Sequence, residues 1–269
     1  MSLLEIREAD APPAIAAIYA EIKAASGLPL VNLIWRHFAA LPGVLPWAWG
    51  AVQPLVTSAS MGQARQRIVA GIALPAPAAV AAADWQDAAS DQGGVARIGA
   101  ILDAYTRGNL TNLVALTALR LRLEQPQAPP GRLLPAIAPP DAPPALDPLP
   151  QLADLLPEIA AQVRALAARH GGTGEVIPSL YLHLAHWPRL LEVLPRWLSA
   201  LYAPAVLEVV RDATRRLAEA EAGTLLPVPT PPPLGAEATL NDALRHFTRQ
   251  VIPDLIPVCL ALNRLRPPN

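Results

Sequence analysis

Most side chains that could take part in chemistry gather in one otherwise apolar stretch, PSLYLHLAHWPRLL, from Pro178 to Leu191. It contains Ser179 and two histidines, His183 and His186, whose spacing places both imidazoles on one face of a helix. Two imidazoles at this spacing can bind zinc, but such a site needs further ligands, and no His-Glu-x-x-His pattern is present. We therefore expect no metal here, and expect both histidines to be partly buried and hydrogen-bonded to backbone or to a neighbour.

The sequence allows more than one role for Ser179 and more than one for His183. A serine that follows a proline is a plausible N-cap of a helix. His183 could act as a general base, because imidazole titrates near neutrality. The pair Trp187-Pro188 predicts that one short helix ends there and that the next begins at Pro188.

The elements that must position these residues are predicted to be helices. Apolar residues recur at helical spacing along nearly the whole chain, with no convincing strand alternation and no Asn-Gly hairpin turn. We therefore predict an all-α fold. Its predicted helices cover residues 14–25, 63–74, 95–106, 110–123, 156–170, 204–223 and 238–252.

Two Pro-rich segments, 124–150 and 226–235, have the composition of extended, semi-rigid linkers. Residues on the two sides of the larger one resemble each other. Segment 38–45 aligns with 184–191, and segment 105–113 aligns with 247–255 at a similar offset. We therefore predict two tandem helical repeats, 1–123 and 151–269, joined by the 124–150 linker and related by a pseudo-twofold axis. A shared site would lie in a pocket between them.

The bulk composition of the 269 residues excludes several classes of protein. A net charge of −1 and 16% charged residues, with no basic run, argue against a nucleic-acid partner. The longest uncharged stretch, 37–62, contains three prolines, which favours short buried helices over a membrane span. The acidic start is unlike a signal peptide, so we expect a cytoplasmic protein. Cys259, the single cysteine, excludes an internal disulfide and is expected to be a small buried hydrophobe.

Three segments, 27–49, 104–119 and 178–191, resemble the group I 2-haloacid dehalogenases. The sharpest matches are Pro-Gly-x-Leu-Pro-x-Ala-Trp over 42–49, the pair Gly108-Asn109, and Ser179 followed by Leu184-Ala185-x-Trp187-Pro188. The resemblance implies an all-α pseudo-dimer that hydrolyses 2-halocarboxylic acids of both configurations. In that family an aspartate activates a water, helped by an asparagine. The water attacks the halogen-bearing carbon directly, without a covalent ester, a cofactor or a metal.

Carried over residue by residue, the resemblance places the family's catalytic asparagine at Asn109 and its carboxylate-binding serine at Ser179. The position of the catalytic aspartate is Leu180, and two aromatic pocket positions are Leu30 and Leu33. Leucine cannot accept a proton, so the family mechanism cannot run unchanged.

Replacement bases to consider are Glu175, in the loop before Ser179, Asp254, by pseudo-symmetry with Asn112, and His183. For Asp254 we favour the simpler role of an acid in the first turn of a helix. Asn109 could also be an N-cap. Tyr105 and its counterpart Phe247 are expected in the pocket or the core.

Two functions therefore stay open. One is a hydrolase of small 2-substituted carboxylic acids that uses Asn109 and Ser179 with a displaced base. The other is a non-catalytic binder of a small ligand, with an apolar pocket shaped by Leu30, Leu33 and Leu180. The sequence also leaves open whether two chains form a homodimer.

Overall fold

A computed structural model of the chain describes residues 3–90, 93–139, 141, 143–170 and 176–267. In these residues the only β-pairing is one isolated bridge, between Ser58 and Ala136. The all-α prediction is confirmed. The helices are α1 (Pro13–Ser26), α2 (Leu33–Ala39), α3 (Val44–Val56), α4 (Ala59–Gly71), α5 (Ala82–Ala89), α6 (Gly94–Glu124), α7 (Pro157–Ala167), α8 (Ser179–Leu184), α9 (Pro188–Trp197), α10 (Pro204–Gly223), α11 (Glu237–His246) and α12 (Ile252–Leu265). Short 3-10 turns are η1 (Glu8–Asp10), η2 (Leu152–Asp154) and η3 (Ala168–His170), and η4 (Phe247–Val251) is a π-helical turn.

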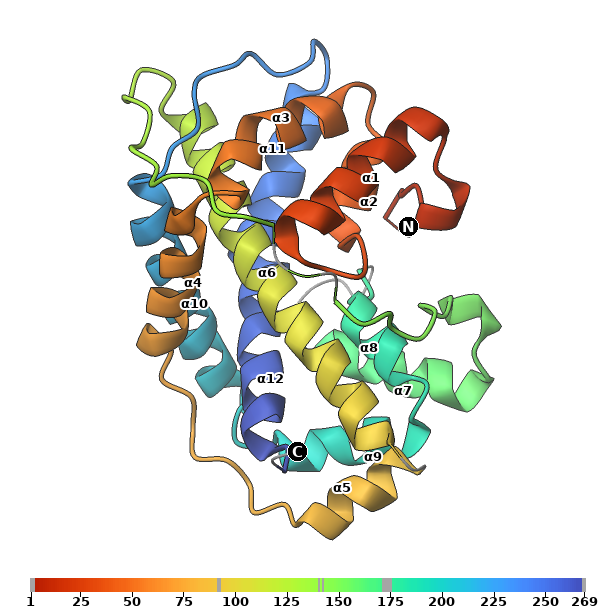
Figure 1. The fold of residues 1–269 in the computed structure, drawn as a ribbon. Helices are drawn as coiled ribbons and strands as arrows, with labels where there is room; N and C mark the ends of the chain where they lie inside the picture. Colours follow the sequence, from red (N-terminus) through yellow and green to blue (C-terminus); the bar gives the residue numbers. More distant parts are fainter. Residues whose placement is uncertain (1–2, 91–92, 140, 142, 171–175, 268–269) are drawn as a thin grey trace.

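The fold is built around α6, which is buried on all sides over much of its length. Every residue from Gly108 to Arg120 is buried, as expected for a helix that is apolar all round. The η4–α12 segment lies beside α6 and runs in the opposite direction (Figure 1), since Arg120 pairs with Thr248 while Thr106 pairs with Asn263.

The remaining helices surround this central pair. α10 packs against both α4 and α6, α5 packs against α9, and α1 packs against α3. In Figure 1, α4 and α10 lie on one side of the α6–α12 pair, and α7 and α8 lie on the other. Because α10 and α12 follow the linker in sequence while α4 and α6 precede it, the two halves of the chain share one continuous core.

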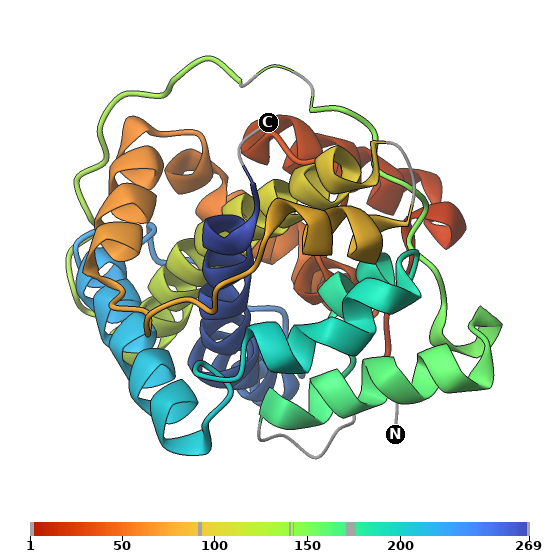
Figure 2. The ribbon, with the colours of Figure 1, turned by 90° about the horizontal axis from the view of Figure 1, so that it is seen from below.

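The described part of the long Pro-rich segment contains no helix between α6 and η2 and passes around the outside of the molecule (Figure 2). Near its middle it is held by two backbone hydrogen bonds: the Ile137 amide donates to Thr57 O at 2.9 Å, and the Ala59 amide donates to Pro135 O at 3.0 Å. The segment is therefore extended, as predicted, and is anchored to the α3–α4 junction.

Several predicted helix boundaries agree with the structure, and one prediction is wrong. The 204–223 helix is α10, and the break before Pro188 separates α8 from α9. The predicted helices 95–106 and 110–123, however, form the single helix α6. Gly108 and Asn109 lie in its interior, because the burial of the whole helix outweighs the low helix propensity of glycine. The N-cap alternative for Asn109 is therefore wrong.

Among the described residues, no helix combines the length and the apolar character needed to cross a membrane.

Candidate functional site

A small cavity lies where α2, α6, α8 and the η4–α12 segment meet; we call it the central cavity. Residues of both halves of the chain surround it. Its polar lining consists of three asparagines, one serine and one tyrosine: Asn32, Asn109, Asn112, Ser179 and Tyr105. Its apolar lining is Leu33, Ile34, Pro178, Phe247, Val251, Ile252 and Leu255.

The side-chain amides of the three asparagines carry buried polar atoms that have no partner in the described part of the chain. These atoms are Oδ1 of Asn32, Nδ2 of Asn109 and Nδ2 of Asn112. The orientation of the Asn112 amide is fixed, because the Trp35 indole N–H can only donate, and it donates to Asn112 Oδ1 at 2.9 Å. At least one N–H donor of the cavity is therefore left for a ligand or for water.

Gly108 allows Asn32 to approach α6 closely. A Cβ added at Gly108 would lie 2.9 Å from Asn32 Oδ1, 3.1 Å from Asn32 Nδ2 and 3.1 Å from Leu28 Cδ1. A side chain of any size at this position would push the Asn32 amide away. The absence of a side chain at Gly108 thus leaves room for the Asn32 amide beside Asn109.

Ser179 is held by a buried arginine from the other half of the chain. Arg36 Nη2 donates to Ser179 Oγ at 3.2 Å, and the same guanidinium forms an ion pair with Glu5 at 2.6 Å. The predicted N-cap role of Ser179 is wrong: Pro178 occupies the N-cap position, and Ser179 is the first residue of α8. Its hydroxyl accepts from Arg36 and lies beside the Tyr105 phenol, so its own proton can be donated to Tyr105 or to a ligand.

Tyr105 connects the central cavity to His183, which does not line it. The Tyr105 hydroxyl lies 2.8 Å from His183 Nδ1, and His183 Nε2 lies 2.9 Å from Asp147 O. A carbonyl only accepts, so Nε2 carries the imidazole proton, and Nδ1 accepts from Tyr105. The result is a directed chain of hydrogen bonds from the cavity to the Pro-rich linker.

Burial determines the protonation of this chain. It lowers the pKa of His183 to about 4 and raises the pKa of the Tyr105 phenol well above its usual value. At neutral pH both groups are therefore uncharged, and the Tyr105 hydroxyl keeps its proton.

The residues predicted from the family resemblance separate into two groups. Asn109, Ser179 and Leu33 lie around the central cavity. Leu180 is fully buried in the hydrophobic core, and Leu30 is half-buried against that core; neither lines the cavity. Phe247 and Tyr105, expected in the pocket or the core, both line the cavity.

Of the replacement bases considered from the sequence, the two that lie in the described residues, Asp254 and His183, do not line the cavity. Asp254 lies in the first turn of α12, is fully buried, and pairs with Arg211. Glu175 lies outside the described residues. His186, like His183, bonds to the linker backbone, through Pro148 O at 2.9 Å, which confirms the expectation that both histidines are satisfied by backbone or a neighbour. The expected partial burial is wrong for His186, which is exposed, whereas His183 is buried. None of the described residues that line the cavity is a carboxylate.

Sequence reasoning missed Asn32, Asn112 and Arg36. Asn112 follows Asn109 by three residues, so helical spacing alone places both on one face of α6. Asn32 and Arg36 lie in the quoted 27–49 segment, but only their contacts with Gly108 and Ser179, far away in sequence, distinguish them from other polar residues.

The central cavity is small. Its volume is about 30 Å³, which is room for about two water molecules. Any ligand larger than that requires some of the apolar lining to move outward.

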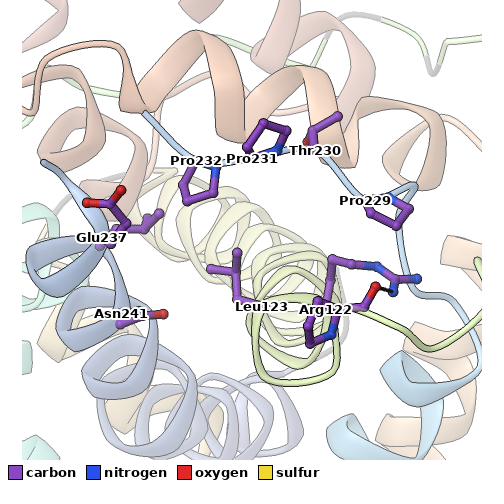
Figure 3. A pocket seen from close by; sticks show the side chains of 10 residues that line it. Arg122, Leu123, Pro229, Thr230, Pro231, Pro232, Glu237 and Asn241 are labelled. Carbon is purple, nitrogen blue, oxygen red and sulfur yellow. Dashed lines mark hydrogen bonds between the residues drawn. The ribbon is translucent and has the colours of Figure 1, made fainter. Parts of the chain in front are cut away.

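A larger cavity, of about 400 Å³, lies elsewhere, between the end of α6, α11 and the second Pro-rich segment (Figure 3). Its most prominent polar side chain, Arg122, donates to Pro227 O and to Ala128 O, each at 2.7 Å. The guanidinium is thus used to hold the two Pro-rich segments together, and none of the residues predicted from the sequence lines this cavity.

In sequence comparisons, no protein-family model and no curated protein matches this chain. Solved structures do match over nearly its whole length. A D-2-haloacid dehalogenase mutant in complex with D-2-CPA is 16% identical, with a TM-score of 0.78, over 98% of this chain and 96% of that one. A D-2-haloacid dehalogenase in complex with L-LA is 17% identical, with a TM-score of 0.79 and the same coverage. The chain therefore has the fold of D-2-haloacid dehalogenase.

Proposed function

We propose that the chain binds a small 2-substituted carboxylic acid in the central cavity and does not hydrolyse haloacids by the direct water attack described above for the group I enzymes. The observation that carries this proposal is the composition of the cavity. It offers donors for a carboxylate but, among its described lining residues, no carboxylate base that could activate a water.

The unpartnered polar atoms support an acid as the ligand. A ligand carboxylate would accept from the free amide N–H groups of Asn109 and Asn112 and from the Ser179 hydroxyl, which Arg36 polarises. The remaining apolar lining suits a short carbon chain. A three-carbon acid exceeds the empty volume, so binding includes outward movement of side chains such as Phe247.

The unpartnered Asn32 Oδ1 supports a preference for a hydroxyl at carbon 2. An amide oxygen accepts hydrogen bonds, so a 2-hydroxyl could donate to it, whereas a halogen could not. A site built to pair with a hydroxyl discriminates strongly against an analogue that lacks one.

The matched structures support the same class of ligand. The two complexes contain D-2-CPA and L-LA, which are 2-substituted carboxylic acids. At 16–17% identity they argue for the fold, and the ligand class comes to this chain only together with the polar cavity.

The tandem repeat remains part of this proposal. The order of elements supports it: α1 to α4 correspond in order and kind to α7 to α10. Long helical runs come last in each half, α6 in the first and the consecutive α11, η4 and α12 in the second. A pseudo-twofold arrangement would explain why α2 and α8 both reach the central cavity.

Calorimetric titration with L-lactate and with both enantiomers of 2-chloropropionate tests the proposal, together with a halide-release assay. We expect saturable binding, tightest for lactate, with no halide release. Asn109→Ala should weaken binding about tenfold, the effect of one lost hydrogen bond to a charged group. Asn263→Ala, near the C-terminal end of α12 and not among the residues that line the cavity, should not change it. Absence of binding to any of the three acids would contradict the proposal.

A second function, hydrolysis with a relayed base, is favoured by one observation, the hydrogen bond from Tyr105 to His183. A water in the cavity could pass its proton to the Tyr105 hydroxyl while that hydroxyl passes its own proton to His183 Nδ1. Halide release that disappears in His183→Gln would establish this function in place of the first.

A further inference from the structure

A third cavity, of about 250 Å³, lies on the side of α6 that faces away from the central cavity; we call it the arginine cavity. Its two cationic residues are Arg65, from α4, and Arg107, from α6. Arg107 and Thr111 are one helical turn apart and face this space. Asn109 and Asn112 lie on another face of the helix and point to the central cavity.

The two arginines have no carboxylate partner in the described part of the chain. Arg65 Nη1 donates to Thr111 Oγ1 at 3.1 Å, and Arg107 Nη1 makes only a long contact, 3.5 Å, to Ser26 O. No acidic residue is among those that line the arginine cavity. The arginines that are fully buried elsewhere have strong acceptors: Arg36 pairs with Glu5, and Arg120 pairs with Glu124 and Glu219. Arg122 has no carboxylate partner in the described residues but donates to several backbone carbonyls.

The positive charges of Arg65 and Arg107 repel each other. Burial lowers the pKa of Arg65, and the nearby positive charge of Arg107 lowers it further. Keeping two half-buried cations together without an anion costs free energy. A bound anion would remove this cost and accept charge-assisted hydrogen bonds from both guanidinium groups.

The walls of the arginine cavity also suit a compact anion. The linker segment 137–139 closes one side, and the hydrogen bond from the Ile137 amide to Thr57 O holds it there. The lining hydroxyls of Thr57 and Ser58 already donate to the carbonyls of Gln53 and Leu55. Recognition of an anion therefore depends on the guanidinium N–H groups.

We propose that the arginine cavity binds a phosphate group, either free or carried by a small molecule, between Arg65 and Arg107. A phosphate carries close to two negative charges at neutral pH, which matches two guanidinium groups. Its oxygens can accept paired N–H bonds from each arginine. The site is separate from the acid-binding site proposed for the central cavity and does not depend on it.

Calorimetric titration with inorganic phosphate, glycerol 3-phosphate and acetate, at constant ionic strength, tests this proposal in the full chain. We expect one phosphate per chain and no saturable binding of acetate in this cavity. Arg65→Gln and Arg107→Gln should each weaken phosphate binding at least about tenfold. Phosphate should also raise the melting temperature of the wild type and of neither variant.

Three controls separate a site from general charge effects. Arg132→Gln, which removes an exposed arginine of the linker, should bind phosphate like the wild type. Asn109→Ala should do so too, since it alters only the central cavity. Without phosphate, Arg65→Gln should melt no lower than the wild type, because it removes the repulsion between Arg65 and Arg107.

Tighter binding of glycerol 3-phosphate than of phosphate would identify an ester as the ligand. No saturable binding, or equal binding by the arginine variants, would overturn the proposal.

Discussion

At the scale of single residues, the polar character of the central cavity depends on how closely Asn32 approaches α6. Gly108 permits this approach because it has no Cβ, and a Cβ there would lie 2.9 Å from Asn32 Oδ1. The Asn109 amide beside it then shares the cavity with Asn32. The absence of a Cβ at Gly108 therefore determines the space between the Asn32 and Asn109 amides.

Replacing Gly108 with alanine tests this dependence. The added methyl should displace the Asn32 amide, weaken binding of the acid about tenfold and, as overpacking, lower the free energy of unfolding by about 1–2 kcal/mol. Gly50→Ala is the matched control, because Gly50 is also helical but has no atom within 4 Å of an added Cβ. It should raise the free energy of unfolding by roughly 0.5–1 kcal/mol. Urea denaturation and calorimetry of both variants measure these effects; tight binding by Gly108→Ala would show that the position of Asn32 is unimportant.

Leu180 shows that a position matched by resemblance can have a different environment. Its side chain is fully buried in the core. Leu180→Asp should therefore lower the free energy of unfolding at pH 7 by about 3 kcal/mol or more, because it buries a carboxyl among apolar side chains. The loss should be smaller at pH 5, since burial raises the pKa of the new carboxyl and keeps it neutral.

Leu180→Asn is the control for size and polarity without charge, and its unfolding should not share this pH dependence. We expect neither variant to release halide from a 2-haloacid. Release by Leu180→Asp alone would show that position 180 reaches the reacting carbon, and would contradict the core placement.

At the scale of elements, the Pro-rich segments are held by side chains of the helices, and Arg122 is the main one. From α6 it donates to Pro227 O and Ala128 O at 2.7 Å, and to Gln125 O at 3.1 Å. Prolines lack an N–H group, so these segments make few hydrogen bonds of their own. The buried guanidinium of Arg122 thus adds to the backbone hydrogen bond that joins the two segments, from the Gly131 amide to Leu226 O at 2.8 Å.

Arg122→Met should release both segments while keeping the apolar length of the side chain. We expect a free energy of unfolding lower by about 3 kcal/mol, because several buried carbonyls lose their donor. Limited proteolysis should then cut near 125–130 and 226–233 faster than in the wild type. Arg132→Gln removes an exposed arginine nearby and should change neither property. An unchanged cleavage pattern in Arg122→Met would mean that backbone hydrogen bonds and packing hold the segments without Arg122.

The helices could be predicted from the sequence more readily than the contacts between side chains that lie far apart along the chain. Helical periodicity gave the limits of α10 correctly, and the Trp187-Pro188 pair gave the start of α9. Periodicity failed at Gly108, where burial of α6 on all sides overrides local propensity. Asn109 and Ser179 were found by resemblance, and both line the central cavity. Arg36 was not found, because its role depends on a contact with Ser179 across the two halves, which no local pattern encodes.

At the scale of the whole molecule, buried ionisable groups link stability to pH. Burial lowers the pKa of His183 and of His170 to about 4. In the unfolded chain both imidazoles have a pKa near the ordinary value of about 6.5. Below that value the unfolded state binds protons that the folded state does not, so stability is lost as the pH falls from about 6.5 towards 4. Asp254 acts in the opposite sense, because burial raises its pKa to about 6.

The two histidines outweigh the single aspartate, so the free energy of unfolding should rise between pH 4.5 and pH 6.5. Each histidine contributes about 2 kcal/mol over this range. His183→Gln keeps a donor for Asp147 O but cannot be protonated. It should therefore reduce the slope of the free energy of unfolding against pH by roughly the contribution of one histidine. Asp254→Asn removes the opposing group and should steepen it. Urea denaturation at several pH values measures all three slopes. A slope in His183→Gln equal to that of the wild type would mean that His183 has the same pKa in the folded and the unfolded chain. Its Nδ1 would then be protonated at the acid end of this range and would donate to the Tyr105 hydroxyl.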